Sequence, residues 1–346
     1  MTCYHPLKGF IIGKTDKGKK KLKVVPYDVE FIPNMNWSPN NCEPIGYDEF
    51  VPIPCGQCIG CRLDYSKQWA TRCMLESKYH DENYFITLTY NEDSVRHSSY
   101  IDDDGVINDI LTLDKRDLQL FFKNLRIKLV RKKQREVESG INRDWTPEIR
   151  YYACGEYGSQ TARPHYHFIG FGLHLDDLQY SKEFSRNGFP VYTSKFLTET
   201  WGYGNVIVGS VTYESCAYVS RYIMKKQKGE GSIVYEKYNI APEFTVMSRR
   251  PGIAFQDFQE NHFDYYPRDS IVLPGGKTCT PPRYFDSLMS EIDEELMENI
   301  KLKRRDIAES IQEYKLGLST ADYLMQLEHA ENNKSRQISK LVRPVD

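Results

Sequence analysis

The sequence of 346 residues is long enough for two modest domains or for one domain with extensions. The formal net charge is only −2, which excludes a globally basic nucleic-acid-binding protein, so attraction to phosphate would depend on local basic surfaces. No apolar run has the length of a transmembrane helix and the first residues lack the apolar core of a signal peptide, so we expect a cytosolic protein without a membrane partner.

Residues 1–61 are expected to form an N-terminal segment of loops and short strands, because Pro, Asn and Gly interrupt the chain repeatedly. The segment ends in a CxxCxxC array, whose spacing lets Cys55, Cys58 and Cys61 converge on one ion as thiolates. The chain has nine cysteines, an odd number, which favours reduced thiols or a metal site over a disulfide framework. A structural Zn²⁺ ion and three reduced thiols are therefore the two alternatives for this array. The candidates for a fourth zinc ligand are Cys3, His5, Cys42 and Cys73.

A helix, a strand and a second helix are predicted next. Residues 62–80 have helical spacing, residues 84–90 (YFITLTY) are typical of a central strand, and residues 91–111 are polar with a turn at residues 102–105. Over residues 113–135 apolar side chains recur at helical spacing, which predicts an amphipathic helix on the sheet. Its other positions are strongly basic, and this face either binds phosphate or is only solvated. The candidate DNA-binding residues of this helix are Lys123, Arg126, Arg131 and Lys132.

The pattern His-x-His carries the most chemical information. In an extended strand successive side chains alternate faces, so His165 and His167 share one face while Tyr166 points to the other. Residues 149–158 predict a second strand that ends in turn-forming residues, and an antiparallel hairpin would bring Glu156 beside the two histidines. Three N and O ligands with open coordination positions suit a catalytic divalent ion. The alternative is an incidental histidine pair without a metal.

A second candidate site element follows. Residues 205–213 predict a strand, and the next residues predict a helix on which Tyr218 and Tyr222 lie one turn apart on the same face, close to Lys225 and Lys226. The tyrosines are either packing residues or nucleophiles. Since a phenol has a usual pKa of about 10, a nucleophilic role needs a metal-polarised phosphate or a nearby cation.

The remaining residues carry fewer signals. Arg249 and Arg250 precede a Pro-Gly turn, where they would either hold a phosphate of DNA or form an exposed basic turn. Turn-forming residues predict a linker at residues 256–282. Residues 283–346 are expected to form a helical C-terminal extension, either for contacts with DNA, a host protein or another copy, or for packing only.

Four motifs occur in an order that resembles the HUH endonucleases, which initiate rolling-circle DNA replication: FITLTY (85–90), GEYG (155–158), RPHYHFIGFG (163–172) and YVSRYIMKK (218–226). More narrowly, the chain resembles the replication initiators of microviruses, the gokushovirus-like phages with single-stranded DNA. The resemblance covers roughly residues 50–255. It implies an α+β fold with a central antiparallel sheet flanked by helices, a ferredoxin- or RRM-like core, and an endonuclease domain at residues 62–255.

The resemblance also implies a reaction. Tyr218 and Tyr222 would act alternately as nucleophiles, assisted by Lys225 or Lys226, to nick single-stranded origin DNA through a 5′-phosphotyrosine link and to rejoin it. Host helicase and polymerase would be partners in the bacterial cytoplasm. A plasmid-type initiator or transposase of the same superfamily is one alternative, and a non-enzymatic zinc-containing nucleic-acid-binding protein is another. The residues expected to hold Mg²⁺ or Mn²⁺ are Glu156, His165 and His167.

Overall fold

The computed structural model describes residues 3–16, 20–28, 50–158, 161–182, 190–221 and 229–339. The chain divides into two compact units, which are described separately. Unit 1 consists of Met1–Asp64 and Lys301–Leu341, and unit 2 is built mainly from Tyr65–Ile300.

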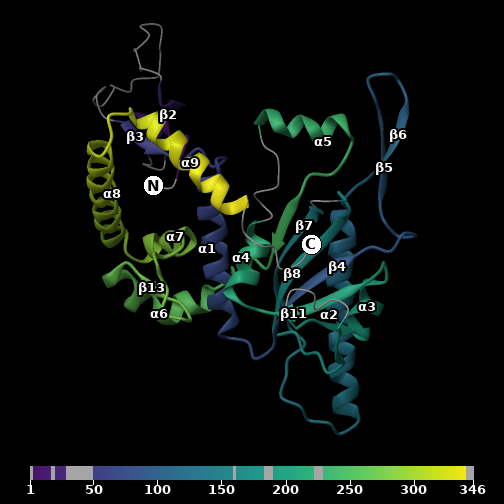
Figure 1. The fold of residues 1–346 in the computed structure, drawn as a ribbon. Helices are drawn as coiled ribbons and strands as arrows, with labels where there is room; N and C mark the ends of the chain where they lie inside the picture. The colour runs from purple at the N-terminus through teal and green to yellow at the C-terminus, as the bar shows by residue number, and fades with distance from the viewer. Residues whose placement is uncertain are drawn as a thin grey trace. The chain divides into compact units, whose positions relative to one another are not determined.

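Unit 2 is centred on a seven-stranded sheet with the order β12-β7-β8-β4-β11-β10-β9 (Figure 1). Every neighbouring pair in this sheet is antiparallel, which confirms the predicted α+β fold with a central antiparallel sheet. The strands are β4 (Asn83–Thr89), β7 (Arg150–Tyr157), β8 (Pro164–Phe171), β9 (Leu178–Tyr180), β10 (Tyr192–Ser194), β11 (Val206–Ser210) and β12 (Phe244–Met247).

One face of the sheet is covered by α2 (Lys115–Glu138) and α3 (Lys195–Trp201). Asp114 caps α2 by accepting a hydrogen bond from the backbone N–H of Arg116. The apolar side of α2 packs against Tyr166 and Phe168 of β8. The buried residues that α2 contributes to this core are Leu118, Phe121, Phe122, Leu125 and Leu129.

The opposite face of the sheet is covered by α4 (Tyr213–Arg221) and by the part of α1 (Ile59–Ser77) that belongs to unit 2. The indole of Trp69 stacks on the ring of Tyr152, with 4.5 Å between the ring centroids. The backbone N–H of Ser215 donates to Thr212 Oγ1, and the N–H of Thr212 donates to Ser215 Oγ. This reciprocal pair fixes the start of α4.

A third cluster of buried side chains forms where the sequence predicts a linker. Residues 256–282 are not a connector, because they include most of α6 (Phe255–Arg268) and the hairpin of β13 (Ile271–Val272) and β14 (Thr278–Cys279). Apolar residues of α6 pack against α7 (Arg283–Ile292) and against the first turns of α8 (Glu294–Gly317). The largest side chains buried in this cluster are Phe258, Tyr265, Tyr266 and Phe285.

The polar stretch at residues 91–111 is a hairpin of β5 (His97–Ile101) and β6 (Ile107–Leu111) around the predicted turn. Figure 1 shows that this hairpin extends away from the main sheet. Beyond α4, the described chain resumes with a 3₁₀ turn (Gly229–Ser232) and α5 (Ile233–Lys237).

Unit 1 contains a three-stranded sheet with the order β2-β1-β3. Its strands are β1 (Leu7–Lys14), β2 (Lys20–Pro26) and β3 (Phe50–Ile53), and α9 (Tyr323–Ser339) also belongs to this unit. The ring of Tyr27 contacts both Phe50 and Tyr323, with ring centroids 5.7 and 5.3 Å away. None of the helices in the described part of the chain is long and apolar enough to cross a membrane.

Candidate active site

The hairpin of β7 and β8 brings Glu156 beside the two histidines, as predicted from strand alternation. Glu156 pairs with His165 in the antiparallel register, and Cys154 pairs with His167. Because side chains alternate along each strand, Glu156, His165 and His167 all lie on the sheet face that α1 and α4 cover. Oε1 of Glu156 lies 2.6 Å from Nε2 of His165 and 3.2 Å from Nε2 of His167.

The other nitrogen of each imidazole is also held. Nδ1 of His165 lies 3.0 Å from the carbonyl oxygen of Arg163, which can only accept, so Nδ1 carries the proton and Nε2 of the neutral ring keeps its lone pair. Nδ1 of His167 lies 2.9 Å from Oγ1 of Thr87 on β4. Metal-binding histidines in proteins are usually oriented in this way, with one nitrogen held and the other directed at the ion.

Glu156 is fully buried, and its ionisation depends on the two histidines. Burial raises the pKa of its carboxyl group, but the hydrogen-bonding contacts with His165 and His167 outweigh burial and hold the pKa well below its usual range. The carboxylate is therefore ionised at neutral pH and is a suitable metal ligand.

The chemistry of these three groups fits a divalent cation. One oxygen or nitrogen atom from each of Glu156, His165 and His167 lies within 4.8 Å of the others. Two imidazoles and one carboxylate suit Mn²⁺ better than Mg²⁺, because Mg²⁺ prefers oxygen ligands. His165 is 17% exposed whereas His167 is 1% exposed, so solvent and substrate reach the group from the His165 side.

Tyr218 lies next to this group. Its ring, on α4, meets the imidazole of His167 edge-on, with 5.5 Å between the ring centroids. Phe85 stacks on the imidazole of His167, also with 5.5 Å between centroids. The remaining predicted residues of the helix, Tyr222, Lys225 and Lys226, lie outside the described residues.

The predicted DNA-binding residues of α2 are not brought together with the metal-ligand candidates. They lie on a helix that packs on the opposite face of the sheet. Nζ of Lys132 lies 2.6 Å from a carboxylate oxygen of Asp176, and the guanidinium of Arg126 lies over the ring of Tyr151. The residues concerned are Lys123, Arg126, Arg131 and Lys132.

Arg249 and Arg250 are exposed and also lie away from the three ligand candidates. They follow the end of β12 that pairs with Tyr152, whereas Glu156 lies near the other end of β7. Any phosphate that they hold is therefore not the one beside His165.

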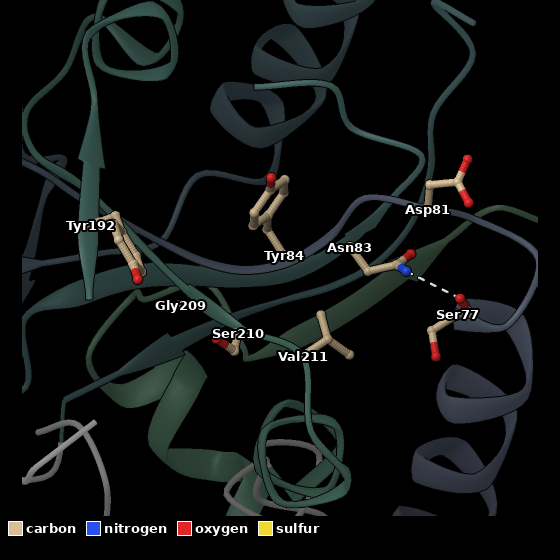
Figure 2. A pocket seen from close by; sticks show the side chains of 8 residues that line it. All are labelled: Ser77, Asp81, Asn83, Tyr84, Tyr192, Gly209, Ser210 and Val211. Carbon is tan, nitrogen blue, oxygen red and sulfur yellow. Dashed lines mark hydrogen bonds between the residues drawn. The ribbon is translucent and has the colours of Figure 1, made fainter. Parts of the chain in front are cut away.

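A pocket of about 270 Å³ opens elsewhere on unit 2. Figure 2 shows Tyr84 and Tyr192 among its lining residues, and the amide nitrogen of Asn83 donating to the carbonyl oxygen of Ser77. Tyr84 lies near the start of β4, whereas the strand residues that pair with His165 and His167 lie toward its other end. The pocket is therefore distinct from the metal-ligand group.

Two supporting contacts were not predicted from the sequence. Thr87 holds His167, and its signal was its place on the inward face of a predicted central strand. On the reverse face, the Tyr166 hydroxyl donates to the carbonyl oxygen of Asp114 and lies 2.7 Å from the Tyr90 hydroxyl. The residue between the two histidines is thereby fixed to the start of α2.

The fold and the site define an α+β protein with a candidate metal centre on an antiparallel sheet, beside a tyrosine on a covering helix. The family model described as replication-associated protein ORF2 matches residues 83–227, from β4 through α4. The chain is 31% identical over 355 residues to replication-associated protein ORF2 of Spiroplasma virus 4, which covers 100% of this chain and 98% of that protein.

Two further relatives are less completely covered. Replication-associated protein VP4 of Bdellovibrio phage phiMH2K is 32% identical over 261 residues, which is 74% of this chain and 75% of that protein. Replication-associated protein ORF4 of Chlamydia phage 1 is 24% identical over 244 residues, 70% of this chain and 54% of that protein. The chain therefore belongs to this family of replication-associated proteins, which confirms the resemblance to microvirus replication proteins. No solved structure matches it.

Proposed function

We propose that this chain is a metal-dependent endonuclease that nicks and rejoins single-stranded origin DNA in the rolling-circle replication of a small phage genome. The observation that supports the proposal is the group of Glu156, His165 and His167 with the ring of Tyr218 against His167. Membership of a family of replication-associated proteins supports a role in DNA replication.

Glu156, His165 and His167 are the residues that would hold Mn²⁺ or Mg²⁺. When bound, such an ion draws charge from the oxygens of the scissile phosphate and stabilises the charge that develops during attack. The chain itself supplies an ionised, buried carboxylate and two imidazoles in fixed orientations, so little reorganisation is needed at the site. The partial exposure of His165 gives DNA its route to the site.

The nucleophile is Tyr218 or Tyr222. The phenol oxygen forms a bond to phosphorus and loses its proton, while the bond from phosphorus to the 3′ oxygen breaks and this oxygen gains a proton. The 5′ end stays linked to tyrosine, and the free 3′-OH serves a host polymerase. Because Tyr218 is 5% exposed, attack by this residue requires its ring to turn away from His167 toward the DNA.

The second tyrosine would then cleave the regenerated origin, and the new 3′-OH would attack the first phosphotyrosine to release a circle. Lys225 or Lys226 would stabilise the phenolate as neighbouring cations. Duplex DNA shields its phosphates from a side chain on a covering helix, so the substrate is single-stranded or locally melted DNA. Host helicase and polymerase in the bacterial cytoplasm would complete the cycle.

The experiment that tests this proposal uses labelled single-stranded oligonucleotides that tile the genome encoding the chain, incubated with the full chain and Mn²⁺. We expect one oligonucleotide to give a protein–DNA adduct that survives a denaturing gel. The double variant Tyr218→Phe/Tyr222→Phe should give no adduct, and Tyr213→Phe, on the same helix, should retain it. No adduct with any oligonucleotide would contradict catalysis and would fit a non-enzymatic nucleic-acid-binding protein.

A further inference from the structure

Cys3 joins the three cysteines of the CxxCxxC array in unit 1. The sulfur atoms of Cys3, Cys55, Cys58 and Cys61 all lie within 4.8 Å of one another. All four are free thiols, and Sγ of Cys58 lies 3.9 Å from Sγ of Cys3, which is far beyond a disulfide bond length. Two segments more than fifty residues apart in the sequence therefore supply one group of four sulfurs.

Backbone N–H groups are directed at these sulfurs. Sγ of Cys55 accepts from the N–H groups of Gln57 and Cys58, at 3.4 and 3.3 Å. Gly56, at a φ of +71°, provides the left-handed residue that this tight turn requires. Such contacts stabilise negative charge on sulfur, which a thiolate carries and a thiol does not.

The two segments also exchange hydrogen bonds with each other. The N–H of Tyr4 donates to Sγ of Cys58, and the N–H of Cys55 donates to Sγ of Cys3, each at 3.3 Å. Cys61 lies in the first turn of α1, and its N–H donates to Sγ of Cys58 at 3.5 Å. The partial positive charge at the start of this helix adds to the stabilisation of thiolates.

The spacing of the sulfurs fits a single tetrahedral ion. Zinc lies about 2.3 Å from thiolate sulfur, which places two sulfurs of a tetrahedral site about 3.8 Å apart. The distance of 3.9 Å between Cys3 and Cys58 agrees with this value. In an iron–sulfur cluster the cysteines bind different iron atoms and their sulfurs are farther apart, so a cluster does not fit.

We propose that Cys3, Cys55, Cys58 and Cys61 bind one structural Zn²⁺ ion as thiolates. Cys3 is the fourth ligand among the candidates that the structure describes, because Cys73 is buried in the sheet core of unit 2 and His5 contacts Glu331. Cys42 lies outside the described residues. The four thiols release their protons on binding, and the net negative charge of the site is offset by the N–H groups described above.

The ion would join three parts of unit 1. Glu331 of α9 lies 2.6 Å from Nε2 of His5 and accepts from the N–H of Ile59 at the start of α1. The residues next to the site thus connect the first residues of the chain, the start of α1 and α9. Because metal binding contributes to folding free energy, removal of the ion should loosen this unit and expose it to protease.

The test measures zinc in the purified full chain by mass spectrometry of the elements, with about one zinc ion per chain expected. Cys3→Ser and Cys58→Ser should lower the zinc content at least about tenfold, since each removes a ligand. Cys279→Ser is the matched control, because this free cysteine lies in unit 2, and it should keep the full content. Glu156→Gln should also keep its zinc, which separates this site from the proposed catalytic one.

A second measurement guards against variants that fail to fold. The wild-type chain, stripped of metal and titrated with Co²⁺, should develop the thiolate-to-cobalt absorption of a tetrahedral four-sulfur site. Full zinc content in Cys3→Ser, visible absorption from bound iron, or a Cys3–Cys58 disulfide in freshly purified protein would each overturn the proposal. So would a wild-type chain that binds neither zinc nor cobalt.

Discussion

His167 is held from several sides, and these contacts set the geometry of the candidate metal centre. Thr87 contacts its Nδ1, Phe85 and Tyr218 contact its ring, and Glu156 contacts its Nε2. A hydroxyl partner on the non-coordinating nitrogen fixes both the ring orientation and the tautomer. The orientation of His167 therefore depends on a residue from a neighbouring strand.

Thr87→Val should weaken Mn²⁺ binding about 10- to 100-fold, because it removes the partner of Nδ1 while it keeps the shape of the side chain. Isothermal titration of the chain with Mn²⁺ measures this affinity. The matched control is Thr89→Val on the same face of β4, whose hydroxyl donates to Asn205 instead. Equal Mn²⁺ affinity in the Thr87 variant and the wild type would remove Thr87 from the site.

At this scale the sequence predicted the three ligand candidates but not their supports. The alternation of His165 and His167 around Tyr166 is a local property of one strand, so it can be read directly. Thr87 and Cys3 act across long sequence separations, which depend on strand order and on chain path. Cys3 was one of several possible ligands until the fold brought it to the array.

Among the elements, α1, β7 and α6 meet at Glu76. Its carboxylate accepts from the N–H of Ala254 at 2.5 Å, just before α6, and from the guanidinium of Arg150 on β7. Burial raises the pKa of Glu76, but the contacts with His80, Ala254 and Arg150 outweigh burial and lower it. The ionised form of Glu76 therefore stabilises the folded state.

Glu76→Gln should lower the free energy of unfolding by about 1–3 kcal/mol at neutral pH, because a partly buried guanidinium and a backbone N–H lose their ionic partner. The lowered pKa means that this stabilisation is present above the unfolded value of about 4.3 and is lost as the pH falls through the folded value. Urea unfolding from pH 7 to pH 3 should show the difference between variant and wild type shrinking. Glu260→Gln, at an exposed position of α6, is the control, and a constant difference at all pH values would contradict the role of ionisation.

Gly204 fixes the approach of β11 to β4. A side chain at this residue, which has a φ of +155°, would meet the carbonyl oxygen of Thr89 and the N–H of Asn91. Gly204→Ala should therefore lower the free energy of unfolding by about 2 kcal/mol or more. Gly209→Ala on β11 has room for a methyl group and should cost much less, as thermal unfolding can measure. Equal losses would show that the backbone contact at Gly204 is unimportant.

The elements that the sequence predicted best are those with regular periodicity. Strands β4, β7 and β8 and helix α2 lie where alternation and helical spacing place them. Helix α6 was wrongly predicted as part of a linker, because nearby Pro and Gly residues outweighed the helical spacing of its apolar residues. The hairpin of β5 and β6 is largely polar and partly exposed along its length, so only its turn was predicted.

For the whole molecule, the two proposed metal sites differ in their chemistry. The group in unit 2 has N and O ligands and is partly open, which suits catalysis, whereas the group in unit 1 has four sulfurs, which suits a structural ion. The near-neutral net charge agrees with this arrangement, because basic residues are local features rather than a general surface property. The α2 residues illustrate the limit of reading charge from sequence, since the fold places them behind the sheet.

The central claim is that a tyrosine on α4 or directly after it becomes covalently linked to DNA beside Glu156, His165 and His167. The most direct measurement is peptide mapping of the protein–DNA adduct by mass spectrometry after nuclease digestion. We predict a nucleotide on Tyr218 or Tyr222, formed with Mn²⁺ by the wild-type chain and lost in His165→Ala. A nucleotide on any other residue, or an adduct that His165→Ala forms equally well, would contradict the account.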